Sequence, residues 1–400
     1  MSELYQLPDG WEWKKLGDLA EYVNGMAFKP NDWVENGLPI IRIQNLNGSN
    51  DFNYFNGEAP SKYYVKNGDV LISWSASLDV YKWNRGEAIL NQHIFNTNIN
   101  YKVVNYDFFY HTIKYSLSEI MKNLHGVGMK HITKGKFENI DVPLPPLSEQ
   151  QRIVAKLDAL FEKIDKAIAL HVKNMEEADG FMASVLNEVF SDLEEKYGVD
   201  SIGNMIDVLT DYHSNGAYKN LKENVELLDQ ENYALMIRAT DLENEDFTNN
   251  VKYITEEAYN FMSKSKIFGG EIILPKIGTI GNVYFMPYLG KPTSLAMNLF
   301  MLRCSDKVMN KFMFLYLKSP KGRECIINKS NGAVTKTITK DAVRSIEIPF
   351  PSLPIQQKIV TYLDDLSSKI EHVKKVQKEK MESLKALKAS ILDSAFHGEL

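Results

Sequence analysis

The sequence predicts an α+β protein in which two globular α/β domains are joined by two long helices that form an antiparallel coiled coil. Three observations lead to this fold class. One motif occurs twice, a long apolar seam at helical spacing follows each copy, and short β-rich runs precede each copy. Together they also predict an internal repeat with a pseudo-two-fold axis.

The repeated motif is PPLSEQQRIVAKLD at residues 145–158 and PSLPIQQKIVTYLD at residues 351–364. The copies are 206 residues apart, and the same offset also places Ile132–Thr133–Lys134 on Ile338–Thr339–Lys340. A solenoid stacks at least roughly three short units. Two long copies therefore favour two domains with parallel roles.

The repeat divides the chain into four segments: a first domain at 1–146, a first helix at 147–198, a second domain at 199–350 and a second helix at 351–400. In both helical segments apolar residues recur at steps that alternate between four and three, which is the spacing of a coiled-coil seam. Each helix offers the other a partner stripe of similar length, so we expect the two to pair within one chain.

The expected helix–helix interface consists of apolar residues at seam positions: Ile153, Leu157, Leu160 and Ile164 in the first helix, and Ile359, Leu363, Leu366 and Ile370 in the second. The second seam is less regular, because Gln377 and Lys388 fall where apolar residues are expected. Two other arrangements would bury the same stripes: each helix could pack onto its own domain, or two copies of the chain could pair.

Short β-rich runs separated by turn residues fill both domains. They are LPIIRIQNL, GDVLISWSAS and AILNQHIFNTNI in the first domain, and YALMIRATDL, GEIILPKIGTIG and NLFMLRC in the second. The repeat is weaker here, although Ile41–Arg42 corresponds to Ile237–Arg238 and Gly68–Asp69 to Gly270–Glu271. A shared scaffold with different detail is expected of two recognition domains with two different targets.

The net charge of −6 hides a strong asymmetry along the chain. Residues 197–257 hold 4 Lys/Arg against 13 Asp/Glu, whereas residues 258–347 hold 14 against 5. Because attraction to phosphate depends on local patches, the second segment is a candidate nucleic-acid surface. A mixed surface whose charges merely segregate along the chain would give the same counts.

The sequence gives no sign of export or membrane insertion. No apolar run is long enough to cross a bilayer, and MSELYQLPDGWEWKKLG at the N-terminus lacks an apolar signal-peptide region. Cys304 and Cys325 form neither a disulfide framework nor a zinc-binding spacing. We therefore expect a cytoplasmic protein with reduced thiols and no membrane partner.

Several stretches of the chain resemble the specificity subunits of Type I restriction–modification enzymes. The opening LPDGWEWKKLGDL, the junctions VPLPPLSEQQRIV and IPFPSLPIQQKIV, the strand motifs GDVLIS and GEIILPKIGTIG, and the ending SILDSAFHGEL are similar to that family in order and spacing. The resemblance implies two target recognition domains, each of which binds one half of a bipartite, asymmetric site in double-stranded DNA.

The resemblance also implies the partners. The paired helices would fix the unread spacer between the half-sites and would dock two methyltransferase subunits, to which the full complex adds restriction subunits that translocate DNA. The chain itself would be non-catalytic. S-adenosylmethionine, ATP and magnesium would belong to the partner subunits, and no cofactor would be bound here.

A search for catalytic motifs agrees with a binding protein. The adenine methyltransferase tetrad [DN]PP[YF] and the phosphate-binding GxxxxGK[ST] are both absent, and the histidines form no metal-binding spacing. Catalytic residues and metal ligands are therefore expected to be none. Two alternatives remain: the specificity subunit of a Type II-like fused methyltransferase–nuclease, and a coiled-coil scaffold between two protein-binding domains.

The candidate DNA contacts divide into two groups. Paired basic residues at the repeat positions are expected to touch phosphates, namely Lys130, Lys134, Lys336 and Lys340. Residues that vary on the shared scaffold are candidates for base contacts, with Ser73–Trp74–Ser75 aligned on Leu274–Pro275–Lys276; the candidates are Arg42, Ser73, Trp74, Ser75, Lys276 and Thr279. Solvated lysines, a core tryptophan and a tight turn around Gly278–Gly281 are the plain structural alternatives.

Overall fold

A computed structural model describes residues 5–75, 78–123, 132–332 and 335–400 of the chain. The chain forms two compact units. Unit 1 comprises Met1–His171 together with Lys378–Leu400, and unit 2 comprises Val172–Gln377. Because both long helices cross the boundary, each unit contains part of each helix.

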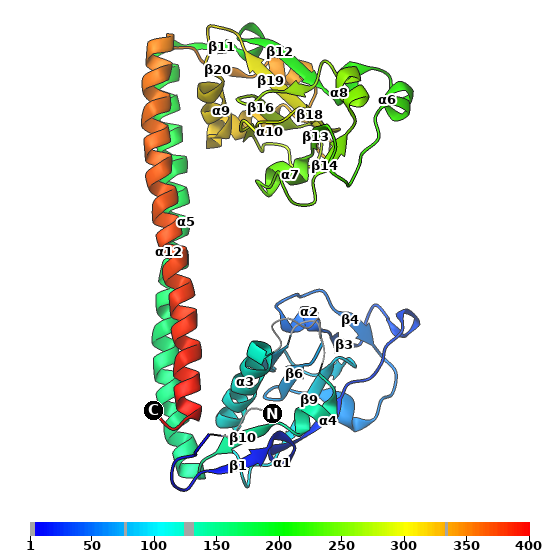
Figure 1. Cartoon of the computed structure of the whole chain (residues 1–400), viewed down its shortest axis with the longest axis vertical. Helices are drawn as coiled ribbons and strands as arrows, with labels where there is room; N and C mark the ends of the chain where they lie inside the picture. The colour runs from blue at the N-terminus through cyan, green and yellow to red at the C-terminus, as the bar shows by residue number, and fades with distance from the viewer. Residues whose placement is uncertain (1–4, 76–77, 124–131, 333–334) are drawn as a thin grey trace. The chain divides into compact units, whose positions relative to one another are not determined.

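Unit 1 is built on two four-stranded sheets within its described residues, with the strand orders β2-β9-β6-β7 and β4-β3-β8-β5 (Figure 1). The β3–β8 pair is parallel, and β1 pairs with β10 in a separate ribbon. The strands are β1 (Glu12–Lys15), β2 (Ala20–Asn24), β3 (Leu38–Ile41), β4 (Asn53–Phe55), β5 (Tyr64–Val65), β6 (Val70–Ser73), β7 (Asp79–Lys82), β8 (Ala88–Leu90), β9 (Ile94–Ile99) and β10 (Asp141–Leu144). The helices are α1 (Leu16–Leu19), α2 (Ile43–Leu46), α3 (Tyr106–Asn123) and α4 (Lys134–Glu138), with 3₁₀ turns η1 (Pro30–Asp32) and η2 (Ser61–Tyr63).

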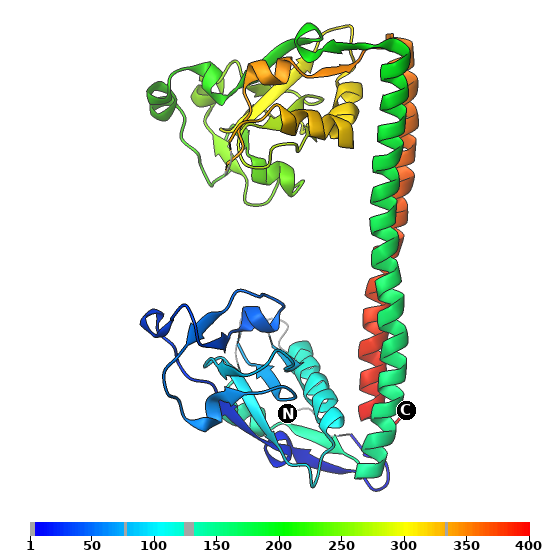
Figure 2. The same ribbon diagram turned by 180° about the vertical axis from the view of Figure 1, so that it is seen from behind.

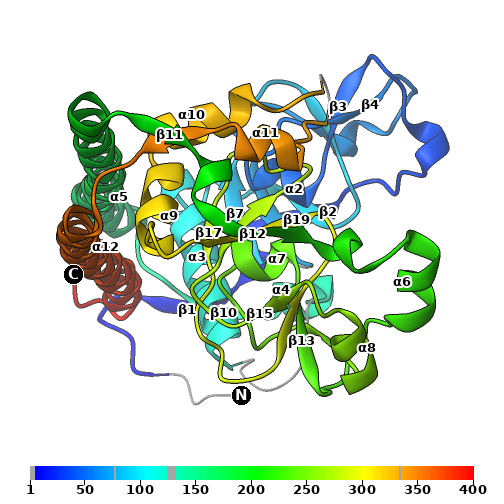
Figure 3. The same ribbon diagram turned by 90° about the horizontal axis from the view of Figure 1, so that it is seen from above.

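Unit 2 repeats this topology strand for strand, with the orders β12-β19-β16-β17 and β14-β13-β18-β15, a parallel β13–β18 pair and a β11–β20 ribbon. Figure 3 shows β11 and β20 side by side near the unit's segments of the long helices. The strands are β11 (Val199–Ser201), β12 (Ile206–Asp211), β13 (Ala234–Ile237), β14 (Lys252–Ile254), β15 (Lys266–Ile267), β16 (Ile272–Pro275), β17 (Tyr284–Phe285), β18 (Thr293–Leu295), β19 (Leu299–Cys304) and β20 (Glu347–Pro349). The helices are α6 (Tyr218–Asn224), α7 (Ala239–Glu243), α8 (Glu256–Phe261), α9 (Asn310–Lys318), α10 (Pro320–Asn328) and α11 (Lys340–Arg344), with 3₁₀ turns η3 (Ile202–Asn204) and η4 (Tyr212–Asn215).

Most of the expected β-rich runs are strands only in part. In LPIIRIQNL the strand ends at Ile41 and α2 follows, because the Asn45 side chain accepts the N–H of Arg42 at the helix start. Arg238 and Asp241 repeat this contact at α7. The run AILNQHIFNTNI divides into β8 and β9, which belong to different sheets.

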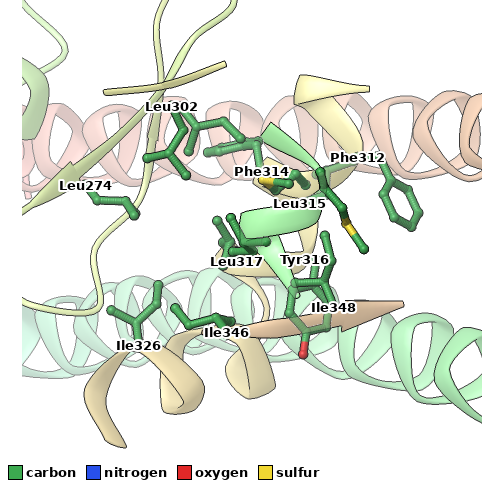
Figure 4. Packing of buried hydrophobic residues seen from close by; sticks show 14 of the residues in the cluster. Leu274, Leu302, Phe312, Phe314, Leu315, Tyr316, Leu317, Ile326, Ile346 and Ile348 are labelled. Atoms are coloured by element: carbon green, nitrogen blue, oxygen red, sulfur yellow. The ribbon is translucent and has the colours of Figure 1, made fainter. Parts of the chain in front are cut away.

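The core of unit 2 lies between the β12-β19-β16-β17 sheet and α9, whose residues from Phe312 to Leu317 are all buried. Figure 4 shows Leu274 and Leu302 from the sheet, together with Tyr316 and its neighbours on α9. Leu186, Phe190 and Leu193 from α5 and Val360 and Leu363 from α12 belong to the same cluster. The corresponding core of unit 1 contains Ile153 and Leu157 of α5 with Leu392 and Phe396 of α12.

The long helices α5 (Leu147–Tyr197) and α12 (Leu353–Phe396) pair antiparallel within each unit (Figures 1 and 2). In unit 1, Asp165 lies 2.8 Å from Lys388, and in unit 2 Asp179 lies 2.9 Å from Lys374, so rising numbers in α5 meet falling numbers in α12. The Lys388 ammonium also lies 4.8 Å from the centre of the Phe161 ring, which accounts for a lysine at this seam position.

All eight expected seam residues are buried or half-buried. Ile153, Leu157, Ile164, Leu363 and Ile370 are buried, and Leu160, Ile359 and Leu366 are half-buried. The first residues of both seams also contact the globular parts, since Ile153 and Leu157 share a cluster with strands of unit 1 and Leu363 shares one with strands of unit 2. Pairing of the two helices within the chain is thus combined with packing of each helix onto a globular part.

The first glutamine of each copy of the repeated motif has the same structural role in both units. Gln150 is fully buried; its Oε1 accepts the N–H of Asn105 at 2.7 Å, and its Nε2 donates to Val103 O at 3.0 Å and Pro145 O at 2.9 Å. Gln356, also fully buried, makes the same three contacts with Met309 N, Lys307 O and Pro351 O. Each glutamine therefore joins the start of a long helix to the loop before α3 or α9.

Candidate nucleic-acid interface

The strand register corrects the alignment made from sequence around β6 and β16. Ile72 pairs with Phe95 and Leu274 pairs with Phe300, so Ser73 is equivalent to Pro275. The N–H of Trp74 donates to His93 O, and that of Lys276 donates to Asn298 O. Trp74, rather than Ser75, is therefore the counterpart of Lys276.

In unit 2 this position belongs to a partly buried ion cluster. Lys276 Nζ donates to Asp211 Oδ2 at 2.6 Å, and Lys340 Nζ lies 2.9 Å from Asp211 Oδ1, which also accepts the Ser214 hydroxyl at 2.6 Å. Burial alone would raise the pKa of the Asp211 carboxyl, but hydrogen bonds from the lysines and Ser214 outweigh it and hold the pKa well below its usual range. Lys276 and Lys340 are thus charge-paired rather than free for phosphate.

Unit 1 fills the same place with different chemistry. Asn24 stands where unit 2 has Asp211, since it pairs with Phe95 as Asp211 pairs with Phe300. The Trp74 ring stacks on Phe95 with a centroid distance of 5.7 Å, and its Nε1 is buried without a hydrogen-bond partner. Trp74 thus packs at the margin of the core, as the plain structural alternative holds, and carries an unsatisfied donor.

The remaining candidates occupy varied environments. Ser73 is fully buried and exchanges hydrogen bonds with the Asp79 backbone, so its hydroxyl does not face a ligand. Ser75 is half-buried. The Arg42 guanidinium lies 5.7 Å from the centre of the Trp33 ring, and its Nε is buried without a partner.

The other candidates lie in loops or at helix starts. Thr279 donates its hydroxyl to Glu243 at 3.2 Å, and Lys134 lies 3.5 Å from Glu138 on the same helix. Lys336 is exposed, and its ammonium has no ion-pair partner among the described residues. Lys130 lies outside the described residues.

The basic segment of unit 2 separates into paired and unpaired cations, a distinction that charge counting missed. Lys276, Lys291, Arg303, Lys311, Lys321, Lys340 and Arg344 each face a carboxylate. The cations of the segment for which the described residues provide no ion pair are Lys264, Lys266, Lys307, Lys318, Arg323, Lys329 and Lys336. These seven are the better candidates for phosphate contacts, because a phosphate need not displace a carboxylate from them.

Two negative findings apply to the part of the chain that the structure describes. It contains no group of three or more His, Cys, Asp or Glu side chains that could hold a metal ion. None of its helices is both long and apolar enough to cross a membrane.

Comparison with protein families matches the model described as the Type I restriction modification DNA specificity domain, over residues 8–174 and again over residues 197–381. The EcoBI specificity subunit of Escherichia coli is 24% identical over 99% of this chain and 88% of its own length. The MjaVIII specificity subunit of Methanocaldococcus jannaschii is 23% identical over 95% of this chain and 91% of its own.

Solved structures agree with the fold. A chain from work on complex assembly and conformational transition of the type I R-M system aligns with a TM-score of 0.70 at 21% identity, covering 99% of this chain and all of that one. The HsdS subunit from Thermoanaerobacter tengcongensis aligns with a TM-score of 0.50 at 21% identity, covering 100% of this chain and 99% of its own. The predicted fold class, with two repeated domains and two long helices, is confirmed.

Proposed function

This chain belongs to the Type I restriction–modification DNA specificity family, and from that premise we propose that each of its units reads one half of a bipartite sequence in double-stranded DNA. The chain is the non-catalytic specificity subunit, and methylation and cleavage are carried by its partners. Of the alternatives considered from sequence, neither the Type II-like subunit nor the protein-binding scaffold is supported by the comparisons.

One observation carries the proposal of two different half-sites. The two units share strand order and register, yet they hold Asn24 and Trp74 in one and Asp211 and Lys276 in the other at equivalent places. Equal scaffolds with unequal side chains at one edge suit two readers with different targets. Two unlike readers give an asymmetric site, whereas two identical ones would give a palindrome.

The proposed partners follow from the family and from the helices. Each unit contains an antiparallel pair of α5 and α12 segments, which suits two copies of a methyltransferase subunit, with restriction subunits added to that complex. S-adenosylmethionine, ATP and magnesium are then bound by those partners, and the complex acts on DNA in the cytoplasm. Among this chain's own cations, Lys134 and the unpaired Lys336 are proposed phosphate contacts.

The experiment that tests the function is a map of methylated adenines in host DNA, with the methyltransferase gene present and this gene either present or deleted. We expect one interrupted, asymmetric methylated motif to disappear on deletion. An unchanged map, with the protein expressed and bound to the methyltransferase, contradicts the proposal. A second chain in which residues 199–350 come from a relative should change one half of the motif only.

A further inference from the structure

We propose that Phe268 and Tyr288 of unit 2, together called the aromatic edge, insert into the minor groove of the half-site that unit 2 reads. The inference rests on the proposed function and names the chemistry of one contact surface within it. Phe268 is 61% exposed and Tyr288 is 82% exposed. Aromatic side chains this exposed leave a large apolar surface in water, and a partner that covers them gains the free energy of burying it.

Buried polar groups fix the turn that carries Phe268. Glu271 is buried, and its carboxylate accepts the N–H of Phe268 and of Gly269, each at 2.8 Å. Arg303 pairs with Glu271 at 3.0 Å, donates to Lys266 O and lies 4.9 Å from the centre of the Phe268 ring. A ring fixed in this way loses little conformational freedom on binding, so its burial contributes more fully to affinity.

The two aromatic residues belong to neighbouring segments. A side chain at Gly269, where φ is +98°, would lie 2.9 Å from the Tyr288 Cα, so the turn after β15 and the loop after β17 are in backbone contact. Between them lies a cavity of about 320 Å³ that is lined by Tyr259, Phe268, Tyr288, Leu289 and Lys291, among others, and by no acidic residue.

The charge around the aromatic edge suits a nucleic acid. Lys266 has no ion pair within the described residues, and its ammonium lies 4.2 Å from the centre of the Tyr259 ring. Lys291 lies 3.5 Å from Glu231, and their side chains are 42% and 78% exposed, so a phosphate can replace that carboxylate at little cost. Apolar rings flanked by cations match a sugar–phosphate strand, whereas an acidic protein surface would not need the rings.

The side chains favour the minor groove. Sequence reading in the major groove relies on hydrogen-bonding side chains that match base edges, but the cavity is lined mainly by aromatic, proline and glycine residues. Apolar wedges between base steps are a feature of minor-groove binding. The lysines would then lie against the phosphates that border the groove.

The equivalent turn in unit 1 shows that the fold does not require the aromatic residue. There the Asp69 carboxylate accepts the N–H of Lys66, as Glu271 accepts that of Phe268. Gly68 donates to Trp83 O as Gly270 donates to Met286 O. The same anchored turn therefore presents a lysine in one unit and a phenylalanine in the other, as expected of a position that distinguishes targets.

The test uses the complete methyltransferase complex containing this chain and a duplex carrying its mapped motif. We expect Phe268→Ala and Tyr288→Ala each to weaken binding by about tenfold, since loss of one aromatic–base contact has effects of this order. Phe268→Trp should retain affinity. Tyr218→Ala removes a tyrosine that is 63% exposed from the acidic segment of unit 2 and should have no effect.

Minor-groove insertion is tested by base analogues that alter only that groove. Replacing guanine by inosine, or adenine by 2,6-diaminopurine, in the second half-site should change the affinity of the wild type but not that of the Phe268→Ala, Tyr288→Ala double variant. Equal analogue effects in both proteins would overturn the inference, and so would unchanged affinity of the single variants. Loss of complex assembly at unchanged thermal stability would assign the edge to a protein partner and also overturn it.

The outcome remains separable from the proposed function. If the wild-type complex itself binds no motif, the function fails. If the wild type binds its motif and the variants bind it equally well, only the aromatic edge fails. Because both side chains are exposed, circular dichroism of each variant should show unchanged unfolding.

Discussion

Replacing a buried glutamine at either helix start should destabilise one unit and leave the other unchanged. Gln150→Leu keeps the approximate volume but removes three hydrogen bonds, and it leaves the Asn105 N–H and two carbonyl oxygens without that partner in a buried site. A buried polar group left unsatisfied costs about 1–3 kcal/mol, and carbonyls tolerate it better than N–H groups. After the gain from the apolar leucine, we expect unit 1 to lose about 3 kcal/mol of unfolding free energy. Gln356→Leu should do the same to unit 2.

The distribution of tryptophan makes this measurable unit by unit. Trp11, Trp13, Trp33, Trp74 and Trp83 are all of the tryptophans in the chain, and all belong to unit 1. Tryptophan fluorescence in urea therefore follows unit 1, while far-UV circular dichroism follows both units. At a slope of about 2 kcal/mol per molar urea, Gln150→Leu should lower the fluorescence midpoint by about 1.5 M, and Gln356→Leu should shift only the dichroism.

The exposed neighbours Gln151 and Gln357 provide the matched controls, and their replacement by leucine should move neither signal appreciably. Equal shifts of the fluorescence midpoint by Gln150→Leu and Gln356→Leu would refute the assignment of one glutamine to each unit. No shift from Gln150→Leu would refute the view that its three hydrogen bonds stabilise the junction.

Three further predictions follow from the ion cluster, the unpaired lysine and the helices. Asp211→Asn should destabilise unit 2 by about 2–3 kcal/mol at pH 7, because Lys276 and Lys340 lose their carboxylate. Since the folded-state pKa of Asp211 is depressed, the stability advantage of the wild type is present above about pH 4 and should shrink as the pH falls below that value. Unfolding followed by circular dichroism at pH 7 and pH 3 will show this difference. Lys336→Ala should weaken DNA binding and reduce the slope of log affinity against log salt by about 0.9 without altering the methylated motif, whereas a changed motif would mean that Lys336 contacts a base. Two seven-residue insertions that keep the heptad phase, one after His171 in α5 and one after Gln377 in α12, should lengthen the helix pair by about 10 Å. The unread spacer in the methylation map should then widen by about 3 base pairs. An unchanged spacer would contradict the view that the helices set the spacer length.

Sequence reasoning reached the helices because their pattern is local. The steps of four and three that place Ile153, Leu157 and Ile164 on one stripe require no knowledge of the rest of the fold, and the two copies of the motif supplied the partner stripe. The match of Arg42 to Arg238 was also found, since both follow a strand and begin a short helix.

The candidate site was harder to predict because its contacts span long separations. The Asp211 carboxylate is 65 residues from Lys276 in the chain. Charge counting therefore treated Lys276 and Lys340 as free cations, whereas both pair with Asp211 in the structure. The loops of the two units differ in length, which shifted the expected counterpart of Lys276 from Trp74 to Ser75. Phe268 and Tyr288 gave no sequence signal, because exposure of an aromatic residue depends on what packs around it.

The composition of unit 1 from two separated stretches has a consequence for synthesis. Its core needs Leu392, Ala395 and Phe396, and the Phe396 ring stacks on Tyr115 at a centroid distance of 4.6 Å. A ribosome delivers these residues only after the whole of unit 2 has emerged. Unit 2 is therefore able to fold first, while the part of unit 1 that is made earlier keeps exposed the apolar surface that these residues later cover. On a nascent chain, unit 1 is begun first and completed last. A chaperone would be needed at its exposed apolar surface during that interval.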